Sequence, residues 1–118
     1  MVDDKRKRRI GELIQQELAS VLLRHPEQPL FAQITITATN VSADLAVAKV
    51  FFSVFDDSKV AEATKALQQA AGFLRNVLAR NLNLRLTPRL NFVYDDSIKR
   101  GQRLSELIDA AIAADEKK

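Results

Sequence analysis

The residues of this chain that could carry out chemistry are two aspartate pairs, one histidine and a set of arginines and lysines. Asp56-Asp57 and Asp95-Asp96 could form a carboxylate dyad or bind Mg²⁺, but each pair precedes a serine at a predicted helix start. Capping of the exposed amides in a first helical turn is the favoured interpretation. The single histidine, His25, is predicted to be an exposed residue just after a helix end.

Other catalytic arrangements are missing from the sequence. The chain has no cysteine, no Ser/His/Asp set, no multi-histidine metal motif, no P-loop and no glycine-rich dinucleotide turn. Catalysis needs converging groups of matched acidity, and this sequence supplies few of them. We therefore predict a protein that is not an enzyme and uses no metal or cofactor. A nuclease that uses Asp95-Asp96 and Mg²⁺ is a hypothesis that we favour far less than a non-catalytic role.

Positive charge is gathered in separate stretches, although the net charge is only +3 and the pI is about 9.4. Arginine presents paired planar donors that suit phosphate, and several such contacts make affinity strongly salt-dependent. Each stretch also has a plain interpretation as solvated surface. The candidate phosphate contacts in these stretches are Lys5, Arg6, Lys7, Arg8, Arg9, Arg75, Arg80, Arg85, Lys99, Arg100 and Arg103.

A short series of elements must position these residues. Apolar residues at helical spacing predict a helix from about Arg6 to Arg24, which two nearby prolines stop. Alternating residues predict strands over 34–39 and 45–55, joined by a reversal at 40–44. A helix capped at 56–58 then runs to about Leu82, and a strand over 90–94 and a final helix fraying toward Lys118 follow. We expect one α+β domain over 1–118, with a three-stranded sheet and its helices on one face.

Gly72 interrupts the apolar stripe of the long helix, which continues on both sides of it. A glycine there costs about 1 kcal/mol relative to alanine, so we predict a bend at Gly72 that some other gain offsets. Two interpretations stay open and are compatible. The glycine could be a helix cap or a point of close packing, or it could form a junction that a phosphate backbone approaches closely.

Several motifs span nearly the whole chain in a fixed order. They are Arg9-Ile10-Gly11-Glu12, Val41-Ser42-Ala43-Asp44-Leu45, Ala71-Gly72-Phe73-Leu74-Arg75 and Phe92-Val93-Tyr94-Asp95-Asp96-Ser97. Together they resemble the bacterial ribosome-binding factor A family. The resemblance implies a single type II KH-like domain, in which a helix kink at Ala70-Ala71-Gly72 replaces the usual GxxG loop. It thereby adds Ala70, Ala71 and Gly72 to the candidate RNA-binding residues. The three glycines of this chain cannot form a GxxG motif, in agreement with that pattern.

The same resemblance implies a non-catalytic assembly factor for the small ribosomal subunit. Its expected partners are the 30S subunit, the immature precursors of that subunit and 16S rRNA, and its expected role is late 16S rRNA maturation, including growth in the cold. We expect the protein in the cytoplasm, because the sequence shows no signal-peptide pattern and no apolar run of about 20 residues for a membrane. We also expect it to be a monomer. The alternative is a protein-protein interaction module that docks through its exposed sheet face without direct RNA contact.

Overall fold

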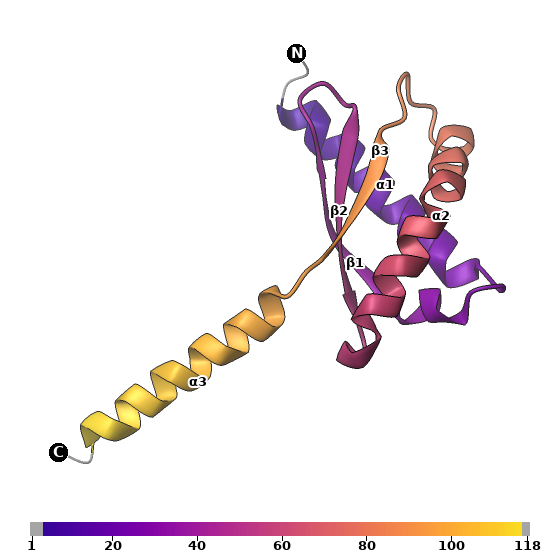
Figure 1. Cartoon of the computed structure of the whole chain (residues 1–118). Coiled ribbons are helices and arrows are strands. Elements are labelled where there is room, and N and C mark those ends of the chain that lie inside the picture. The colour runs from indigo at the N-terminus through magenta and orange to yellow at the C-terminus, as the bar shows by residue number, and fades with distance from the viewer. Residues whose placement is uncertain (1–3, 117–118) are drawn as a thin grey trace.

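The fold is a three-stranded sheet with two helices packed on one face and a third helix that projects away (Figure 1). The structure is a computed structural model, and it describes residues 4–116. Its helices are α1 (Asp4–Arg24), α2 (Val60–Asn81) and α3 (Ser97–Glu116), and its strands are β1 (Ile34–Val41), β2 (Val47–Val54) and β3 (Arg89–Tyr94). Short 3-10 helices, η1 (Pro29–Gln33) and η2 (Asp57–Lys59), precede β1 and α2. The predicted α+β class is confirmed.

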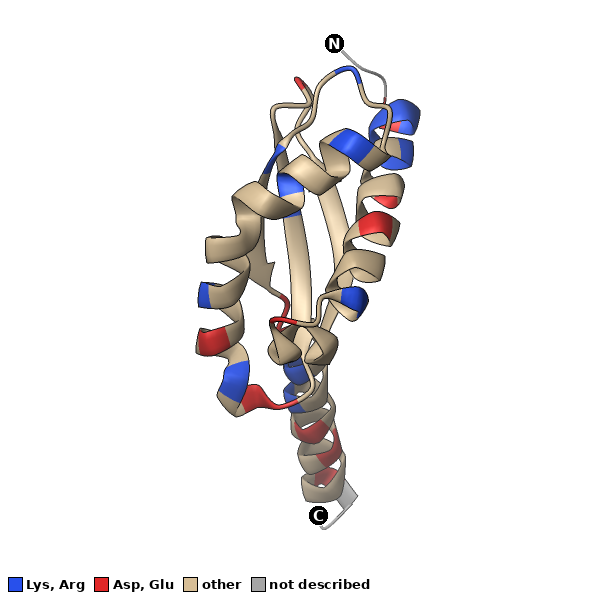
Figure 2. Cartoon of the chain, turned by 90° about the vertical axis from the view of Figure 1, so that its right-hand side faces the viewer, with Lys and Arg blue, Asp and Glu red and all other residues tan. Residues whose placement is uncertain are grey.

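The sheet is mixed, in the order β1-β2-β3. β1 and β2 form an antiparallel hairpin, whereas β2 and β3 are parallel, so α2 serves as the crossover between them. Val50 pairs with Thr39 on one side and with Phe92 on the other, which places these three residues on the same face. α1 and α2 cover that face, as Figures 1 and 2 show, and the opposite face of the sheet stays open.

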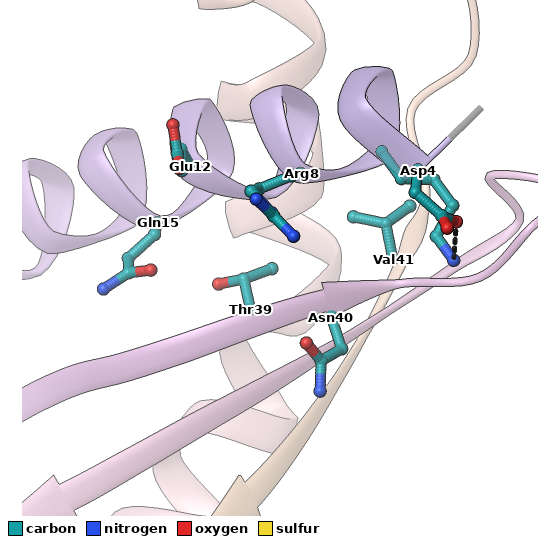
Figure 3. Close-up of a pocket in the computed structure, with 8 residues that line it drawn as sticks. Asp4, Arg8, Glu12, Gln15, Thr39, Asn40 and Val41 are labelled. Carbon is teal, nitrogen blue, oxygen red and sulfur yellow. Dashed lines mark ion pairs between the residues drawn. The ribbon is translucent and has the colours of Figure 1, made fainter. Parts of the chain in front are cut away.

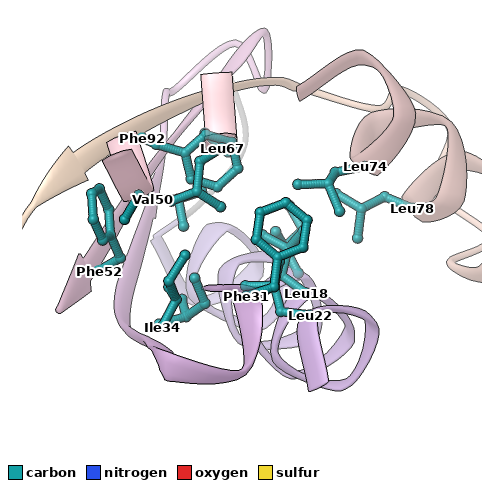
Figure 4. Close-up of a cluster of buried hydrophobic side chains, with 14 of the residues drawn as sticks. Leu18, Leu22, Phe31, Ile34, Val50, Phe52, Leu67, Leu74, Leu78 and Phe92 are labelled. Carbon is teal, nitrogen blue, oxygen red and sulfur yellow. The ribbon is translucent and has the colours of Figure 1, made fainter. Parts of the chain in front are cut away.

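The hydrophobic core lies between the sheet and these two helices (Figure 4). The core side chains of the helices recur at helical spacing, and those of the sheet alternate along each strand. They include Ile14, Leu18 and Leu22 of α1, Leu67, Leu74 and Leu78 of α2, and Ile34, Val50, Phe52 and Phe92 of the sheet. Burying a side chain of this size stabilises a fold by about 1.5–3 kcal/mol, so this layer holds the two helices on the sheet.

Gly11 lets α1 lie close against the edge strand β1. A Cβ atom at Gly11 would lie 2.9 Å from the carbonyl oxygen of Thr39, which belongs to the backbone of β1 and cannot swing away. One turn later, Gln15 Nε2 donates a hydrogen bond to the carbonyl oxygen of Ile36 at 3.3 Å. The position of α1 on β1 therefore depends on a residue without a side chain.

Gly72 has a different environment from the one that the sequence suggested. α2 is a single helix that continues through Gly72, and its ribbon is bent rather than divided into two segments (Figure 2). Gly72 is exposed, and a Cβ atom there would meet nothing within 4 Å. No helix ends at Gly72 and no neighbour approaches it closely, so the cap and close-packing interpretations are both wrong.

The hairpin turn also differs from the prediction. We expected the second strand to begin at Leu45, but β2 begins two residues later, at Val47. Leu45 has a φ of 60°, in the left-handed region, and such a conformation cannot continue an extended strand. β1 correspondingly continues to Val41.

His25 is half-buried, whereas we predicted an exposed residue. Its ring contacts the rings of Phe31 and Phe73 edge-on, with 5.4 Å between the centroids in both pairs. Phe31 belongs to η1, which folds back toward the end of α1 and was not predicted. The prolines after α1 therefore redirect the chain into a packed 3-10 turn rather than a solvated loop.

α3 contributes nothing to the core. Every described side chain of α3 except Lys99 is exposed, including Leu107 at 67% and Ile108 at 50%. The helix points away from the domain and accounts for much of the 63 Å length of the molecule (Figure 1). The prediction of helices on one face therefore holds for α1 and α2, and α3 lies outside this layer. The expected fraying toward Lys118 lies outside the described residues.

Candidate nucleic-acid interface

Most of the predicted cations gather at one end of the domain (Figure 2). We call this the loop end; it comprises the start of α1 (4–10), the turn 42–46 and the segment 80–88, which includes the end of α2. The cations come from three separate stretches of sequence, namely Lys5, Arg6, Lys7, Arg8 and Arg9 in α1, Arg80 in α2 and Arg85 in the loop. All except the half-buried Lys7 are exposed. The fold thus concentrates positive charge that the sequence had dispersed.

A cleft of about 620 Å³ lies in the loop end, between the start of α1 and the segment 83–86. Two arginines of α1 and one of the loop line it together with four apolar side chains. The lining residues are Arg6, Arg9, Ile10, Leu45, Asn83, Leu84, Arg85 and Leu86. Ile10 is buried and Leu45 and Leu84 are half-buried, whereas the three arginines are exposed. The cleft therefore has an apolar interior and a cationic margin, and no carboxylate is among the residues between 4 and 116 that line it.

Hydrogen bonds hold the turn 42–46 beside this cleft. Ser42 Oγ donates to Asp44 Oδ1 at 2.7 Å, and the same oxygen accepts from the amide of Ala46 at 3.0 Å. The amide of Val47 donates to Ser42 Oγ at 3.0 Å. The Ser42 hydroxyl, followed by the Ala46 amide, lowers the pKa of Asp44 below its ordinary value. These bonds keep Leu45 at its positive φ, a conformation that costs a non-glycine residue about 1–2 kcal/mol.

The loop 82–88 is fixed from two sides. The guanidinium group of Arg75 donates to the carbonyl oxygen of Thr87 from Nε at 3.2 Å and from Nη2 at 2.9 Å. The amide of Arg89 donates to the carbonyl oxygen of Ala46 at 2.9 Å, which joins the loop to the turn 42–46. We predicted that Arg75 contacts phosphate, but its guanidinium group is engaged in positioning the loop that carries Arg85.

Lys99, Arg100 and Arg103 do not join the other cations. They lie at the start of α3, next to the end of β3 that is farther from the loop 82–88 (Figure 1). Lys99 Nζ lies 3.0 Å from Asp57 Oδ2, and this contact raises the pKa of Lys99. Arg100 Nε lies 2.8 Å from Asp96 Oδ1. We call this region, residues 95–103 with Asp57, the α3 root. Two of its three cations already pair with carboxylates.

The predicted kink residues also lie apart from the cleft. Ala70, Ala71 and Gly72 occupy the middle of α2, and none of them lines the cleft. Ala70 and Ala71 are half-buried and pack against the core. Gly72 alone offers an open backbone surface.

One aspartate of each pair accepts a hydrogen bond from the amide of the serine two residues later, in the manner predicted for a cap. The prediction for α2 is wrong, because Asp56 caps the 3-10 helix η2, and Lys59 at the start of α2 makes no side-chain capping bond. Asp56 Oδ1 accepts a hydrogen bond from the amide of Ser58 at 3.0 Å, and Asp95 Oδ1 accepts one from the amide of Ser97 at 2.9 Å. Hydrogen bonds from these serines are the largest cause of the lowered pKa of each aspartate. Within residues 4–116, no three His, Cys, Asp or Glu side chains gather closely enough to hold a metal ion.

A smaller cavity of about 330 Å³ lies between α1 and β1 (Figure 3). Figure 3 shows Arg8 directed from α1 toward β1, with Asp4 and Glu12 on the same helix. Lys7 Nζ lies 3.9 Å from Asp4 Oδ1, an exposed ion pair that contributes little stability. Because this cavity carries both signs of charge, it suits a polyanion less well than the cleft of the loop end.

Comparison with known proteins identifies the family. The model of the family described as ribosome-binding factor A matches residues 6–108. The chain belongs to the ribosome-binding factor A family. The ribosome-binding factor A of Thioalkalivibrio sulfidiphilus is 45% identical over 114 residues, which cover 96% of this chain and 88% of the relative. The family is named for binding, not for a catalysed reaction.

Solved structures of ribosome-binding factor A share the fold. The crystal structure of the Thermus thermophilus protein is 28% identical to this chain, with a TM-score of 0.66 over 75% of this chain and 94% of that one. A homology model of the Thermus thermophilus factor, fitted into a cryo-EM map of a 30S complex with that factor, is 27% identical with a TM-score of 0.64. It covers 77% of this chain and 97% of the other.

We did not predict the apolar lining of the cleft from the sequence of this member of the ribosome-binding factor A family. We had placed Leu45 in a strand, and Leu84 and Leu86 stood in a loop without periodicity. Isolated leucines near a core are ordinarily core residues, so their types carry no signal. The usable signal was the Ser42-x-Asp44 spacing, which is typical of a hydrogen-bonded turn.

None of the helices described between residues 4 and 116 is long and apolar enough to cross a membrane.

Proposed function

We propose that this chain is a non-catalytic assembly factor that binds the 30S subunit and its immature precursors and promotes late 16S rRNA maturation, including in the cold. Membership of the ribosome-binding factor A family supports this, as does the structural likeness to a factor fitted into a 30S complex. The observation that carries the proposal is the convergence of cations from α1, α2 and the loop 82–88 on one end of the domain. The factor works as a cytoplasmic monomer with a KH-like domain that lacks GxxG.

The physical role of such a factor needs no bond to be made or broken. Cations that replace counterions on rRNA supply affinity that falls steeply with added salt. A protein that binds one rRNA conformation more tightly than another shifts their balance by that difference in affinity. The rigid loop end suits this role, because Arg75 and Arg89 hold the loop 82–88 in place before any RNA arrives.

The direct test is co-sedimentation of the full chain with purified immature and mature 30S subunits at about 50 mM and about 200 mM salt. We expect binding at low salt, preference for the immature particle and a marked loss at the higher salt. The variant Arg6→Glu/Arg9→Glu/Arg85→Glu should lose binding. The control Arg24→Glu/Lys65→Glu/Arg103→Glu changes the net charge equally at exposed sites elsewhere and should bind. Equal sedimentation of both variants would contradict the proposed surface.

The maturation role has its own test in cells. A strain that carries only the loop-end triple variant should accumulate unprocessed 16S rRNA, and more strongly at low temperature. Normal processing in that strain at every temperature would refute the role in maturation, even if the protein still bound subunits.

A second candidate function, contact with another protein, is favoured by one observation. Leu104, Leu107, Ile108 and Ile112 form a stripe on one face of α3, and each is at least 50% exposed. Exposed apolar stripes of this kind mark docking surfaces. If protein contact dominates, Leu107→Gln/Ile108→Gln should abolish subunit binding and added salt should leave wild-type binding unchanged. We expect the opposite on both counts.

A further inference from the structure

We propose that the loop-end cleft takes up a single unpaired nucleobase, while Arg6, Arg9 and Arg85 hold the phosphates beside it. This inference rests on the proposed function, because it states which feature of rRNA the loop end would recognise. It differs from a purely electrostatic surface in one respect. A double helix presents its phosphates, 2′-hydroxyls and groove edges to such a surface and keeps the faces of its bases stacked, whereas a base turned out of its helix can enter an apolar cleft.

The size and lining of the cleft fit such a group. Its volume of about 620 Å³ lies within the range of about 300–1,000 Å³ that is usual for small-molecule sites. Ile10, Leu45 and Leu84 supply an apolar interior, and Leu86 is 50% exposed in a cleft that three arginines also line. Phosphate contact alone gives no reason for apolar side chains at this place, whereas the face of a base does.

The polar groups of the cleft complete the fit. Arg6, Arg9 and Arg85 come from two sides of the cleft and complement the phosphates that flank an extruded nucleotide. Asn83 supplies an amide that can donate to and accept from the edge of a base. With one amide and no aromatic ring in the lining, the cleft should accept different bases with little discrimination.

The backbone conformation of Leu45 also supports a binding site at the cleft. A leucine at φ 60° costs about 1–2 kcal/mol that a glycine would not, and bonds from Ser42 and Asp44 maintain that conformation. Strained residues that their surroundings hold in place are concentrated at binding sites. Here the strained residue is one of those that make the cleft apolar.

The cleft is also formed in advance. Arg75 holds the loop 82–88 through Thr87, and the Arg89 amide joins that loop to the turn 42–46 through Ala46. Leu45, Leu84 and Leu86 therefore keep their relative positions without RNA. Pre-organisation of this kind reduces the entropy that binding would otherwise cost.

An RNA hairpin with one bulged nucleotide tests the proposal in the full chain. Its partner is the same hairpin with an abasic bulge, which keeps every phosphate and removes only the base. We expect the chain to bind the bulged base about tenfold more tightly, an effect in the range of a base stacked on a protein surface. Fluorescence anisotropy at a fixed salt concentration measures both affinities.

Paired variants locate the effect. In Leu45→Asn/Leu86→Asn the preference for the base should fall to within about twofold, since asparagine tolerates the positive φ at position 45 but removes the apolar lining. The control Leu23→Asn changes a leucine that is 70% exposed at the far end of α1, and it should keep the tenfold preference. Arg85→Gln should weaken binding of both hairpins equally.

Each outcome decides between the proposals. Equal affinity of the wild-type chain for the two hairpins, or no binding to either, overturns the base-binding cleft. Equal affinity would also be the result if the cleft held an acidic peptide instead. Co-sedimentation with 30S subunits is independent of this comparison, so the proposed function can survive the loss of the cleft. A preference for the bulged base without co-sedimentation with 30S subunits would support the base-binding cleft and contradict the proposed function.

Discussion

The loop end and the α3 root are both rich in cations, yet the fold uses their charges in opposite ways. At the loop end, Arg9 and Arg85 are exposed beside a cleft that no carboxylate of the described part of the chain lines. At the α3 root, Lys99 pairs with Asp57 and Arg100 pairs with Asp96. Clusters of similar composition therefore serve different purposes, according to which acidic side chains the fold places next to them.

The largest expected effect is on the affinity for 30S subunits, when two cations of the loop end are replaced and the result is compared with the same replacement at the α3 root. Arg80→Gln/Arg85→Gln should lower the affinity for 30S subunits on the order of tenfold or more and reduce the slope of log K against log salt by about 0.9 for each phosphate that the variant no longer binds. Lys99→Gln/Arg100→Gln removes the same charge from the α3 root and should change affinity by less than about threefold, because the carboxylates of Asp57 and Asp96 beside these cations repel phosphate and offset the attraction. Filter binding over a salt series measures both. Similar losses would show that the two regions act alike.

The second expected effect concerns how α1 reaches the loop end. Gly11→Ala should reduce the free energy of unfolding by about 1–3 kcal/mol, because its Cβ would clash with the Thr39 carbonyl oxygen and α1 would have to shift. Gly72→Ala should instead be neutral or stabilising by up to about 1 kcal/mol, since a Cβ there meets nothing. Urea unfolding measures both. A destabilising Gly72→Ala would reveal strain at the bend of α2.

The third expected effect tests the support of the loop 82–88. Arg75→Gln should lower the free energy of unfolding by about 0.5–1.5 kcal/mol, through the lost bonds to Thr87, and should make the loop more sensitive to limited proteolysis. Arg80→Gln, farther along α2, removes an equal charge without touching Thr87 and should leave the loop as resistant as in the wild type. If both variants were cut equally, Arg75 would have no positioning role.

The smallest expected effect is the response of the two regions to acid. Hydrogen bonds lower the pKa of Asp44 at the loop end and of Asp95 at the α3 root below the ordinary 3.8. Ionised aspartate is therefore favoured in the folded state, so its contribution to stability is full well above pH 3.8 and is lost as pH falls through the lower folded values. Asp44→Asn and Asp95→Asn should each reduce the dependence of urea unfolding on pH between about 5 and about 3. An unchanged dependence would show that these bonds do not persist in solution.

Much of the fold followed from local pattern. The stripe of Ile14, Leu18 and Leu22 predicted the buried face of α1, because a helix repeats every 3.6 residues wherever it packs. Asp56 and Asp95 were correctly predicted to accept hydrogen bonds from nearby amides, since such bonds join residues close along the chain, although Asp56 caps η2 and not α2. Such interactions lie within a few residues of the chain and can be predicted from its sequence.

The candidate site depended on contacts between distant segments. Gly11 and Gly72 look alike in the sequence, and only the approach of β1 makes Gly11 the glycine that packing requires. In the sequence, Lys99 and Arg85 look equally able to bind phosphate. In the structure, Lys99 Nζ lies 3.0 Å from Asp57 Oδ2, which comes from another part of the chain. Local pattern determined which surfaces of the helices and strands are buried, because the buried face of each element shows in the spacing of its own apolar residues. Tertiary structure alone decided which charges stay exposed around the cleft, because electrostatic partners are set by distance in space and not by distance along the chain.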